Sequence, residues 1–296
     1  MKEQKVKNTF LRSPLNYIGG KYKLLPQMSP LFPKNINTFV DIFCGGCNVG
    51  INVDAGKVIF NDNLIYLIDL YNSLRTSSLE DILAHIEERI STYNLSLTNE
   101  EGYKAFRAHY NEVRNPLDLF VLVAYSFNHQ IRFNNKHEFN NPFGRERSSF
   151  NPSMKVNLQR FVNAIKQKDV KFTSFNFDDM DLSFLGINDY VYCDPPYLIT
   201  TGSYNDGRRG FTGWDKSSEI KLLEILDSLQ SRGIGFGLSN VLTHKGKTNS
   251  ILAEWIKDNH YKVYHLSKSY KNSNYQSAFN DGNITDEVFV TNKIEV

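Results

Sequence analysis

The sequence predicts an α/β fold in which a parallel sheet is interrupted by a mostly helical insertion. Short apolar runs alternate with segments of helical periodicity at both ends of the chain, as strands and helices do in a parallel sheet. Between about residues 77 and 160 the strand-like runs stop and helical segments follow one another. The chain has 296 residues, 41% of them hydrophobic, which is enough for one such domain with an insertion.

Before the insertion, each element is indicated by a change in periodicity. We expect a strand at 38–43, a glycine-rich turn at 44–47, a helix at 49–53, a strand at 58–60 and a helix at 64–74. The strands are short apolar runs, whereas residues 64–74 repeat apolar side chains at helical spacing. This order is how a parallel α/β sheet begins.

The insertion and the second half of the sheet follow the same logic. Helices are predicted at 79–90, 101–113 and 117–125, and residues 128–157 form a segment rich in Asn, Phe and Arg, with turns at Asn141-Pro142 and Asn151-Pro152. The sheet resumes with strands at 170–175, 189–193, 234–239, 261–266 and 287–291 and helices at 217–229 and 250–258. We therefore predict one domain made of residues 1–75 and 165–296, and an inserted domain of residues 76–164.

The charge of the chain is balanced overall but not locally. The chain has 34 Lys and Arg against 32 Asp and Glu, a formal net charge of +2 that implies no polyanionic partner by itself. Between Arg132 and Arg160, six basic and two acidic residues leave a local charge of +4. A nucleic-acid surface is therefore expected in the insertion.

Cysteine and hydropathy patterns exclude several classes of protein. Three cysteines are too few for a disulfide framework, and no second ligand pair at zinc spacing accompanies Cys44 and Cys47. We expect these two to line a turn, Cys193 to lie in the core, and no metal to be bound. No apolar stretch approaches the ~20 residues of a membrane span, and residues 1–10 lack the apolar core of a signal peptide, so we expect a cytoplasmic protein without membrane contact.

The first motif with chemical meaning follows the strand at 38–43. It reads Asp41-Ile-Phe-Cys-Gly45-Gly46, and glycines directly after a strand let the backbone approach a ligand closely. Asp62 ends the next strand, where α/β nucleoside sites place an acid to accept hydrogen bonds from ribose hydroxyls. The phosphate-binding patterns of NAD and ATP sites are absent, which favours a nucleoside without a pyrophosphate. An ordinary turn with a surface Asp fits this motif as well.

The second motif, Asp194-Pro195-Pro196-Tyr197, follows the strand at 189–193. The prolines stiffen the turn and remove backbone donors, which leaves carbonyl groups at the carboxyl edge of the sheet. The Asp194 carboxylate and the Pro195 carbonyl could accept the two N–H groups of an amino group on a flat heterocycle, while Tyr197 stacks on its ring. The alternative is a plain turn with a buried tyrosine.

Taken in order, the motifs resemble those of Dam-type (class alpha) DNA adenine-N6 methyltransferases. The resemblance spans nearly the whole chain and rests on residues 15–21 (Leu-Asn-Tyr-Ile-Gly-Gly-Lys), 41–47, 61–62, 132–134 with 139–144, and 194–197. It implies a Rossmann-like methyltransferase sheet with an inserted, mostly helical target-recognition domain, S-adenosyl-L-methionine as cofactor and double-stranded DNA as partner. It also implies a monomer of restriction-modification, phage or orphan type, with a restriction endonuclease of the same site as a partner that does not bind it directly.

The resemblance further implies residue roles around the cofactor. The cofactor-binding residues would be Tyr17, Lys21, Asp41, Gly45, Asp62, Asn176, Phe177 and Asp194. The catalytic residues would be Asp194, Pro195, Pro196 and Tyr197, which hold the amino nitrogen for direct methyl transfer. Asn176 departs from the usual Asp of an Asp-Phe pair around the cofactor's adenine, but it can still form hydrogen bonds.

On the DNA side, the implied contacts lie mainly in the insertion. They are Asn16, Phe127, Asn128, Arg132, Asn134, Arg145 and Arg147. Phe127 and Asn128 match residues that fill the space left by a flipped base, and Arg132 matches a guanine-reading arginine. Many members that modify GATC have Lys at the place of Asn16, and residues 129–131 also depart, so the expected site is GATC or a relative such as CATG.

Several alternatives stay open. Cytosine N4, adenine in RNA and a protein glutamine amide present an amino group to the same kind of pocket, and an inactive DNA-binding relative would share the insertion. Intact Asp62, Asp194 and Tyr197 argue against an inactive protein. Methylation of cytosine C5 is disfavoured because that chemistry needs a cysteine nucleophile, and no Cys follows either proline of the second motif.

Overall fold

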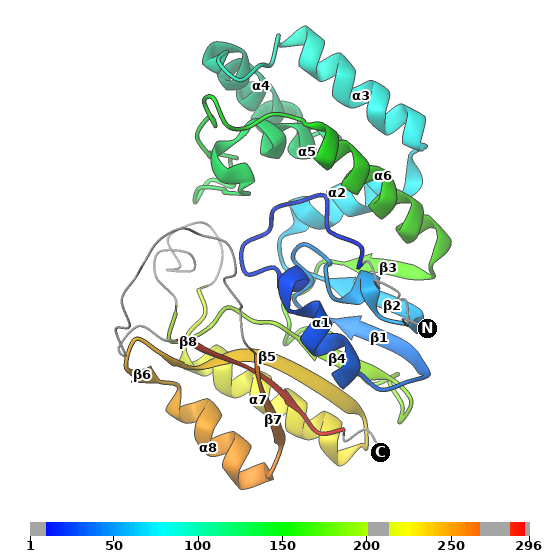
Figure 1. The fold of residues 1–296 in the computed structure, drawn as a ribbon, viewed down its shortest axis with the longest axis vertical. Helices are drawn as coiled ribbons and strands as arrows, with labels where there is room; N and C mark the ends of the chain where they lie inside the picture. The colour runs from blue at the N-terminus through cyan, green and yellow to red at the C-terminus, as the bar shows by residue number, and fades with distance from the viewer. Residues whose placement is uncertain (1–9, 201–212, 267–284, 294–296) are drawn as a thin grey trace, which may run out of the picture.

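The computed structural model describes residues 10–200, 213–266 and 285–293, and a single eight-stranded sheet organises them (Figure 1). The strand order is β3-β2-β1-β4-β5-β8-β7, and the short β6 pairs with β5. The strands are β1 (Ile36–Asp41), β2 (Ala55–Asn61), β3 (Val170–Thr173), β4 (Tyr190–Cys193), β5 (Gly235–His244), β6 (Lys247–Thr248), β7 (Lys262–Leu266) and β8 (Thr285–Thr291).

The direction of the strands determines where a ligand can bind. Five neighbouring strands, β3, β2, β1, β4 and β5, run parallel to one another. In contrast, β8 is antiparallel to both of its neighbours, β5 and β7. The chain leaves β1 toward β2 and β3 and later returns on the other side of β1 as β4, with Val40 opposite both Ile59 and Val191. In open α/β sheets, ligands bind outside the carboxyl ends of the strands at such a reversal of strand order.

Both faces of the sheet are covered because side chains alternate along each strand. Phe39 and Tyr190 belong to one apolar cluster and Val40 and Val191 to the other. The first cluster includes residues of α1 (Leu25–Met28) and α2 (Ile65–Thr76), and the second includes residues of α7 (Lys216–Ser231) and α8 (Ser250–Asn259). The sheet is thus the middle layer of a three-layer domain.

The segment between α2 and β3 is mostly helical. It contains α3 (Leu79–Thr92), α4 (Glu100–Val113), α5 (Pro116–Tyr125) and α6 (Pro152–Gln167). Figure 1 shows α3, α4 and α5 gathered at the end of the molecule opposite α7 and α8. The apolar core runs without interruption from the sheet through α2 into this segment, and the domain boundaries at 76 and 164 stay a prediction. No helix among the described residues is long and apolar enough to cross a membrane.

The α/β sheet with inserted helices is the predicted fold class, and most elements are confirmed to within a few residues. The helix predicted at 49–53 is wrong, because only one 3-10 turn, Gly50–Asn52, separates the glycine-rich turn from β2. The last six residues of the loop-like segment at 128–157 are also not loop, since α6 begins at Pro152. There the Asn151 side chain accepts a hydrogen bond from Met154 N, and proline suits the first turn of a helix. The short helices within residues 21–31 were not predicted.

Candidate active site

An open pocket lies at the carboxyl edge of the sheet where the strand order reverses. It contains about 390 Å³ of space between atoms, part of which is open solvent at its mouth. Three segments form it: residues 17–21, the turn after β1, and Asp194 after β4. The lining residues are Tyr17, Ile18, Gly19, Gly20, Lys21, Asp41, Phe43, Cys44, Gly45, Gly46, Asn48, Val49, Tyr192 and Asp194.

The turn after β1 needs glycine at its second position. Gly45 has φ +44, and a Cβ there would lie 2.8 Å from the Tyr17 ring. The Tyr71 hydroxyl donates to the Gly45 carbonyl at 2.7 Å, and Gly45 N donates to Asp62 Oδ2 at 3.0 Å. These two buried partners hold the turn against the aromatic ring that lines the pocket.

Asp62 supports the pocket from behind and is absent from its lining. Its other oxygen accepts a hydrogen bond from Leu64 N at 2.9 Å. Burial raises the pKa of its carboxyl to about 6, against the opposing effect of the two backbone donors. Its predicted contact with a ribose therefore requires one of the remaining lone pairs of these oxygens.

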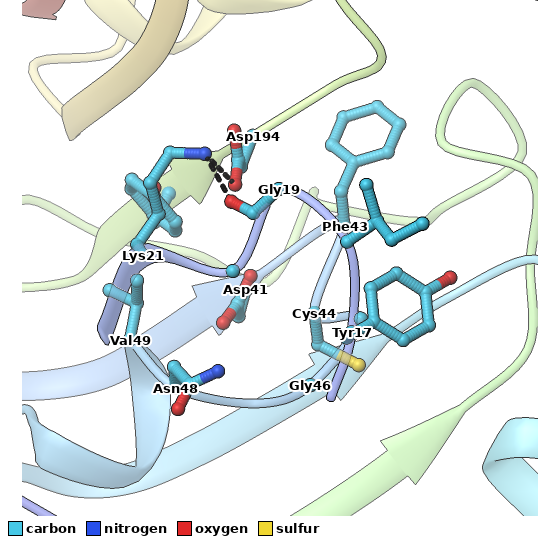
Figure 2. A pocket seen from close by; sticks show the side chains of 14 residues that line it. Tyr17, Gly19, Lys21, Asp41, Phe43, Cys44, Gly46, Asn48, Val49 and Asp194 are labelled. Atoms are coloured by element: carbon cyan, nitrogen blue, oxygen red, sulfur yellow. Dashed lines mark hydrogen bonds and ion pairs between the residues drawn. The ribbon is translucent and has the colours of Figure 1, made fainter. Parts of the chain in front are cut away.

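Asp41 is buried at the end of β1 and faces the pocket, as Figure 2 shows. Its Oδ2 accepts a long hydrogen bond, 3.4 Å, from Gly50 N, and its Oδ1 has no hydrogen-bond partner among the described residues. Burial raises the pKa of this carboxyl well above its usual range, and the nearby Asp194 carboxylate adds to the effect. A buried acceptor without a partner is costly, so Asp41 marks a place for a donor or cation from a ligand.

Four residues from three parts of the chain form a polar network beside Asp41. Lys21 Nζ lies 2.7 Å from Asp194 Oδ2, 2.8 Å from the Gly19 carbonyl oxygen and 3.5 Å from Glu287 Oε1. The Tyr197 hydroxyl lies 3.0 Å from Asp194 Oδ1 and 3.1 Å from Glu287 Oε1. Figure 2 shows Lys21 bridging Gly19 and Asp194 above Asp41. The predicted catalytic residues Asp194 and Tyr197 are thus in direct contact.

The network sets the protonation of its members. Burial raises the pKa of the Asp194 carboxyl, the Lys21 ammonium opposes that rise, and Glu287 adds to it. Burial and the two carboxylates together raise the pKa of Tyr197 well above its usual range, which keeps its hydroxyl protonated as a donor. Lys21 therefore favours the charged form of Asp194 that can accept hydrogen bonds.

The other predicted cofactor residues lie around rather than in the pocket. The Phe177 ring packs on Phe43, which lines the pocket, with centroids 5.6 Å apart, and both rings pack on Trp214. Asn176 is exposed and donates to Asp179 Oδ2 at 3.4 Å. Pro195 is buried and Pro196 half-buried after β4, next to Asp194. An aromatic wall thus continues from the pocket to Phe177.

The predicted base-flipping residues form a turn between α5 and the strand-like bridge at Phe133. Asn128 and His129 both have left-handed backbone, with φ of 55 and 53, and Phe127 is 40% exposed. The buried Asn141 side chain donates to the carbonyls of Phe127 and Gln130, each at 3.0 Å. An internal amide therefore holds the strained turn in shape while its tip faces outward.

The remaining DNA-side candidates occupy different environments. Asn16 Nδ2 donates to the Asn128 carbonyl at 3.1 Å, which joins the segment beside the pocket to the turn. Arg132 is held by the side chain and carbonyl of Asn140, at 2.9 and 3.1 Å, and the Arg147 guanidinium lies 5.1 Å from the centre of the Phe127 ring.

Asn134 and Arg145 are already engaged within the protein. The Asn134 side chain closes its own loop by accepting from Lys136 N and Glu138 N. Arg145 forms an exposed ion pair with Glu100 at 2.7 Å. An exposed pair of this kind is weak and exchangeable, whereas the Asn134 contacts belong to the loop itself.

Some residues of the site were not predicted from the sequence, Glu287 above all. The sequence does contain a feature that could have indicated Glu287: it is an acid directly before an apolar run, Glu287-Val-Phe-Val-Thr291. Phe43 and Trp214 were also missed. No spacing rule connects Trp214, 20 residues after Asp194, to the turn after β1.

The cysteines lie where the sequence predicted. Cys44 and Cys47 are buried in the turn after β1, and Cys193 is buried in the core. Burial raises the pKa of all three thiols, which keeps them protonated and unreactive. The described residues contain no cluster of His, Cys, Asp and Glu suited to a metal ion.

The sheet and its pocket define an α/β protein with an open pocket at the strand reversal and an Asp-Pro-Pro-Tyr motif at its edge. Comparison with known families identifies its class. Residues 17–280 match the model of the D12 class N6 adenine-specific DNA methyltransferases. The chain belongs to this family.

Individual relatives agree with the family. The chain is 53% identical over 285 residues to type II methyltransferase M.FokI of Planomicrobium okeanokoites, and 52% identical over 283 residues to modification methylase StsI of Streptococcus sanguinis. Each match covers 96% of this chain but only 43% of the relative, so the chain spans less than half their length. The DNA adenine methylase of Escherichia coli K12 is 30% identical over 233 residues, 77% of this chain and 80% of that protein.

Proposed function

We propose that this chain transfers a methyl group from S-adenosyl-L-methionine to N6 of an adenine flipped out of double-stranded DNA. The observation that carries the proposal is the meeting of Asp41 and Asp194 at one pocket, at the ends of adjacent strands. One carboxylate suits a cationic ligand, and the other opens the Asp-Pro-Pro-Tyr motif that suits an amino group. Membership of the adenine-specific family supports the choice of adenine and of DNA.

The pocket residues fit S-adenosyl-L-methionine. The unpartnered Asp41 Oδ1 is suited to a cationic amino group such as that of the methionine part, and Gly45 lets the Tyr17 ring lie against the turn, where a Cβ would clash with it. Tyr17, Lys21, Asp41 and Gly45 would hold the cofactor, with Asp62 toward the ribose and Phe177 behind Phe43 toward its adenine. When bound, the cofactor supplies the activated methyl group.

The protein's own contribution is to position the target nitrogen. The adenine amino nitrogen is a weak nucleophile because its lone pair is delocalised into the ring. Hydrogen bonds from its two N–H groups to Asp194 and the Pro195 carbonyl would aim the lone pair at the methyl group, and Tyr197 would stack on the base. Asp194 need not be a strong base, because the amino proton becomes acidic only as methylation proceeds. Positioning of this kind can account for most of the rate.

We further propose that residues 76–164 recognise the DNA. The rigid turn at Phe127 and Asn128 would occupy the space left by the flipped base, whose extrusion costs a few kcal/mol. Arg132 would read a guanine through O6 and N7. The candidate sites are GATC and relatives such as CATG, and we expect a monomer whose counterpart is a restriction endonuclease of the same site.

Methylation of mixed-sequence plasmid DNA with labelled cofactor, followed by modified-base sequencing, tests the proposal. We expect N6-methyladenine in one short site. Asp194→Ala should abolish transfer while cofactor and DNA binding persist, and Asp258→Ala, at an exposed acid of α8, serves as a folded control. N4-methylcytosine as product, or unchanged transfer by Asp194→Ala, would overturn the assignment.

A further inference from the structure

Glu287 is a buried carboxylate on a strand whose next four residues, 288–291, are all buried. On β8, Val288 and Val290 pack into the cluster beneath α7 and α8, whereas Phe289 packs into the opposite cluster. Alternation along the strand places Glu287 on the same face as Phe289, and it is 3% exposed. A charge at such a position is costly unless its partners compensate it, so its partners indicate its purpose.

Both described partners of Glu287 also contact Asp194. Lys21 Nζ lies 3.5 Å from Glu287 Oε1 and 2.7 Å from Asp194 Oδ2. The Tyr197 hydroxyl lies 3.1 Å from Glu287 Oε1 and 3.0 Å from Asp194 Oδ1. Each donor therefore stands between two carboxylates, and the single phenolic hydrogen of Tyr197 can point to only one of them at its best geometry.

This arrangement matters because Asp194 is engaged at both oxygens. Lys21 contacts one oxygen and Tyr197 donates to the other, so an arriving amino group must compete for lone pairs. Glu287 offers both donors a second acceptor within reach. They can shift toward it without losing a partner in a buried site, where an unsatisfied donor is costly.

We propose that Glu287 is a positioning residue for methyl transfer: it takes up the Tyr197 hydroxyl and the Lys21 ammonium when Asp194 accepts the amino hydrogens of the target base. This inference rests on the proposed function. Once its hydroxyl donates to Glu287, the Tyr197 side chain keeps a buried partner while its ring stacks on that base. Loss of the Glu287 charge should therefore slow the chemical step more than it weakens binding.

The test is Glu287→Gln in the full chain, with Asp286→Asn as the matched control. Asp286 is the neighbouring acid on β8, and its described partner is His265, at 2.8 Å and away from the pocket. We expect single-turnover methylation of a wild-type substrate plasmid by Glu287→Gln to slow on the order of 10- to 100-fold, with cofactor and DNA affinity within about threefold of wild type. Asp286→Asn should match wild type in all three.

A pH profile separates this role from a purely structural one. Among the described residues, the titratable groups near Glu287 include Lys21, Asp194, Tyr197 and Tyr192. Because the Glu287 charge raises the pKa of Asp194, its removal should move the acid limb of the single-turnover rate to lower pH. A slow variant whose acid limb stays in place, or moves to higher pH, would contradict the proposal, as would a wild-type rate.

A second variant keeps the test decisive if Glu287→Gln does not fold. Glu287→Asp retains the charge but shortens the reach to the Tyr197 hydroxyl, so its rate should fall while its acid limb stays near that of wild type. A wild-type rate in Glu287→Asp would overturn the positioning role. The same assay also tests the proposed function by itself. If the wild-type chain transfers no methyl group to adenine, the proposed function is wrong, whatever the rates of the Glu287 variants.

Discussion

The ammonium of Lys21 lies 2.7 Å from Asp194 Oδ2, although 173 residues separate them in the chain. Lys21 is buried, 3% exposed, and also donates to the Gly19 carbonyl. The contact ties the segment before α1 to the turn after β4. It also gives the carboxylate of the Asp-Pro-Pro-Tyr motif a counter-charge, from which a pH effect follows.

Replacing Lys21 should move the acid limb of methylation to higher pH. The Lys21 charge opposes the raised pKa of Asp194, so Lys21→Met should raise that pKa further. The rate should then fall at a higher pH than in wild type, because less Asp194 is charged there. The measurement is the pH profile of single-turnover methylation at saturating cofactor.

Lys23→Met is the matched control, since Lys23 is an exposed lysine two positions further along. Its profile should overlay that of wild type. An acid limb that stays in place in Lys21→Met would show that Lys21 does not set the charge of Asp194.

Asp41→Asn should weaken cofactor binding and leave the fold as stable as before or more so. The folded-state pKa of Asp41 is raised, so its protonated form favours folding at low pH and this stabilisation is lost as pH rises through the raised pKa. At neutral pH a neutral amide removes the cost of the buried charge. We expect about 10- to 100-fold weaker cofactor binding by calorimetry, from loss of a charge-assisted hydrogen bond.

The stability arm of this prediction is a thermal unfolding scan at neutral pH without cofactor. Asp54→Asn, a change at an exposed acid before β2, controls for loss of one negative charge. A large fall in the midpoint of Asp41→Asn, together with wild-type cofactor affinity, would mean that Asp41 is a structural residue.

Cofactor affinity should depend on pH through Asp62. Its pKa is about 6 in the folded protein, so its carboxylate is available to a ribose hydroxyl above that pH and becomes protonated below it. Asp62→Asn should bind cofactor more weakly than wild type at pH 8, and the difference should narrow as pH falls to 5. Isothermal titration at several pH values measures both curves, and parallel curves would exclude this role.

Arg132 and Arg145 should differ in what they contribute to DNA binding. Arg132→Ala should relax discrimination at one guanine of the site, by about 1–3 kcal/mol, because a bidentate base contact is lost. Arg145 is exposed in an ion pair with Glu100, so Arg145→Ala should weaken binding to all sequences alike and lower the slope of log affinity against log salt by about one. Competition binding with single-base variants of the site, at several salt concentrations, measures both effects. If the two arginine variants lose the same sequence discrimination and the same salt dependence, the proposed difference between Arg132 and Arg145 is wrong.

The sequence predicted the sheet well because strand and helix periods are local properties. The runs at 170–175 and 189–193 became β3 and β4 nearly as predicted. Helix α6 was missed because Asn151-Pro152 is as typical of a helix start as of a turn, and only the Asn151 cap on Met154 N distinguishes them. The division at residues 76–164 stays a prediction, because one apolar core continues from α2 into the insertion.

By itself, the sequence determined the motifs that make this chain a member of the adenine-specific family: the turn from Asp41 to Cys47 and Asp194 to Tyr197. Only the tertiary structure decided their surroundings, because β8 joins the sheet beside β5 and carries Glu287 to within 3.1 Å of the Tyr197 hydroxyl across 90 residues of sequence. It also left Asp41 Oδ1 without a partner among the described residues. Spacing predicts which groups lie at a strand end, whereas burial and long-range pairing determine their charge and their partners.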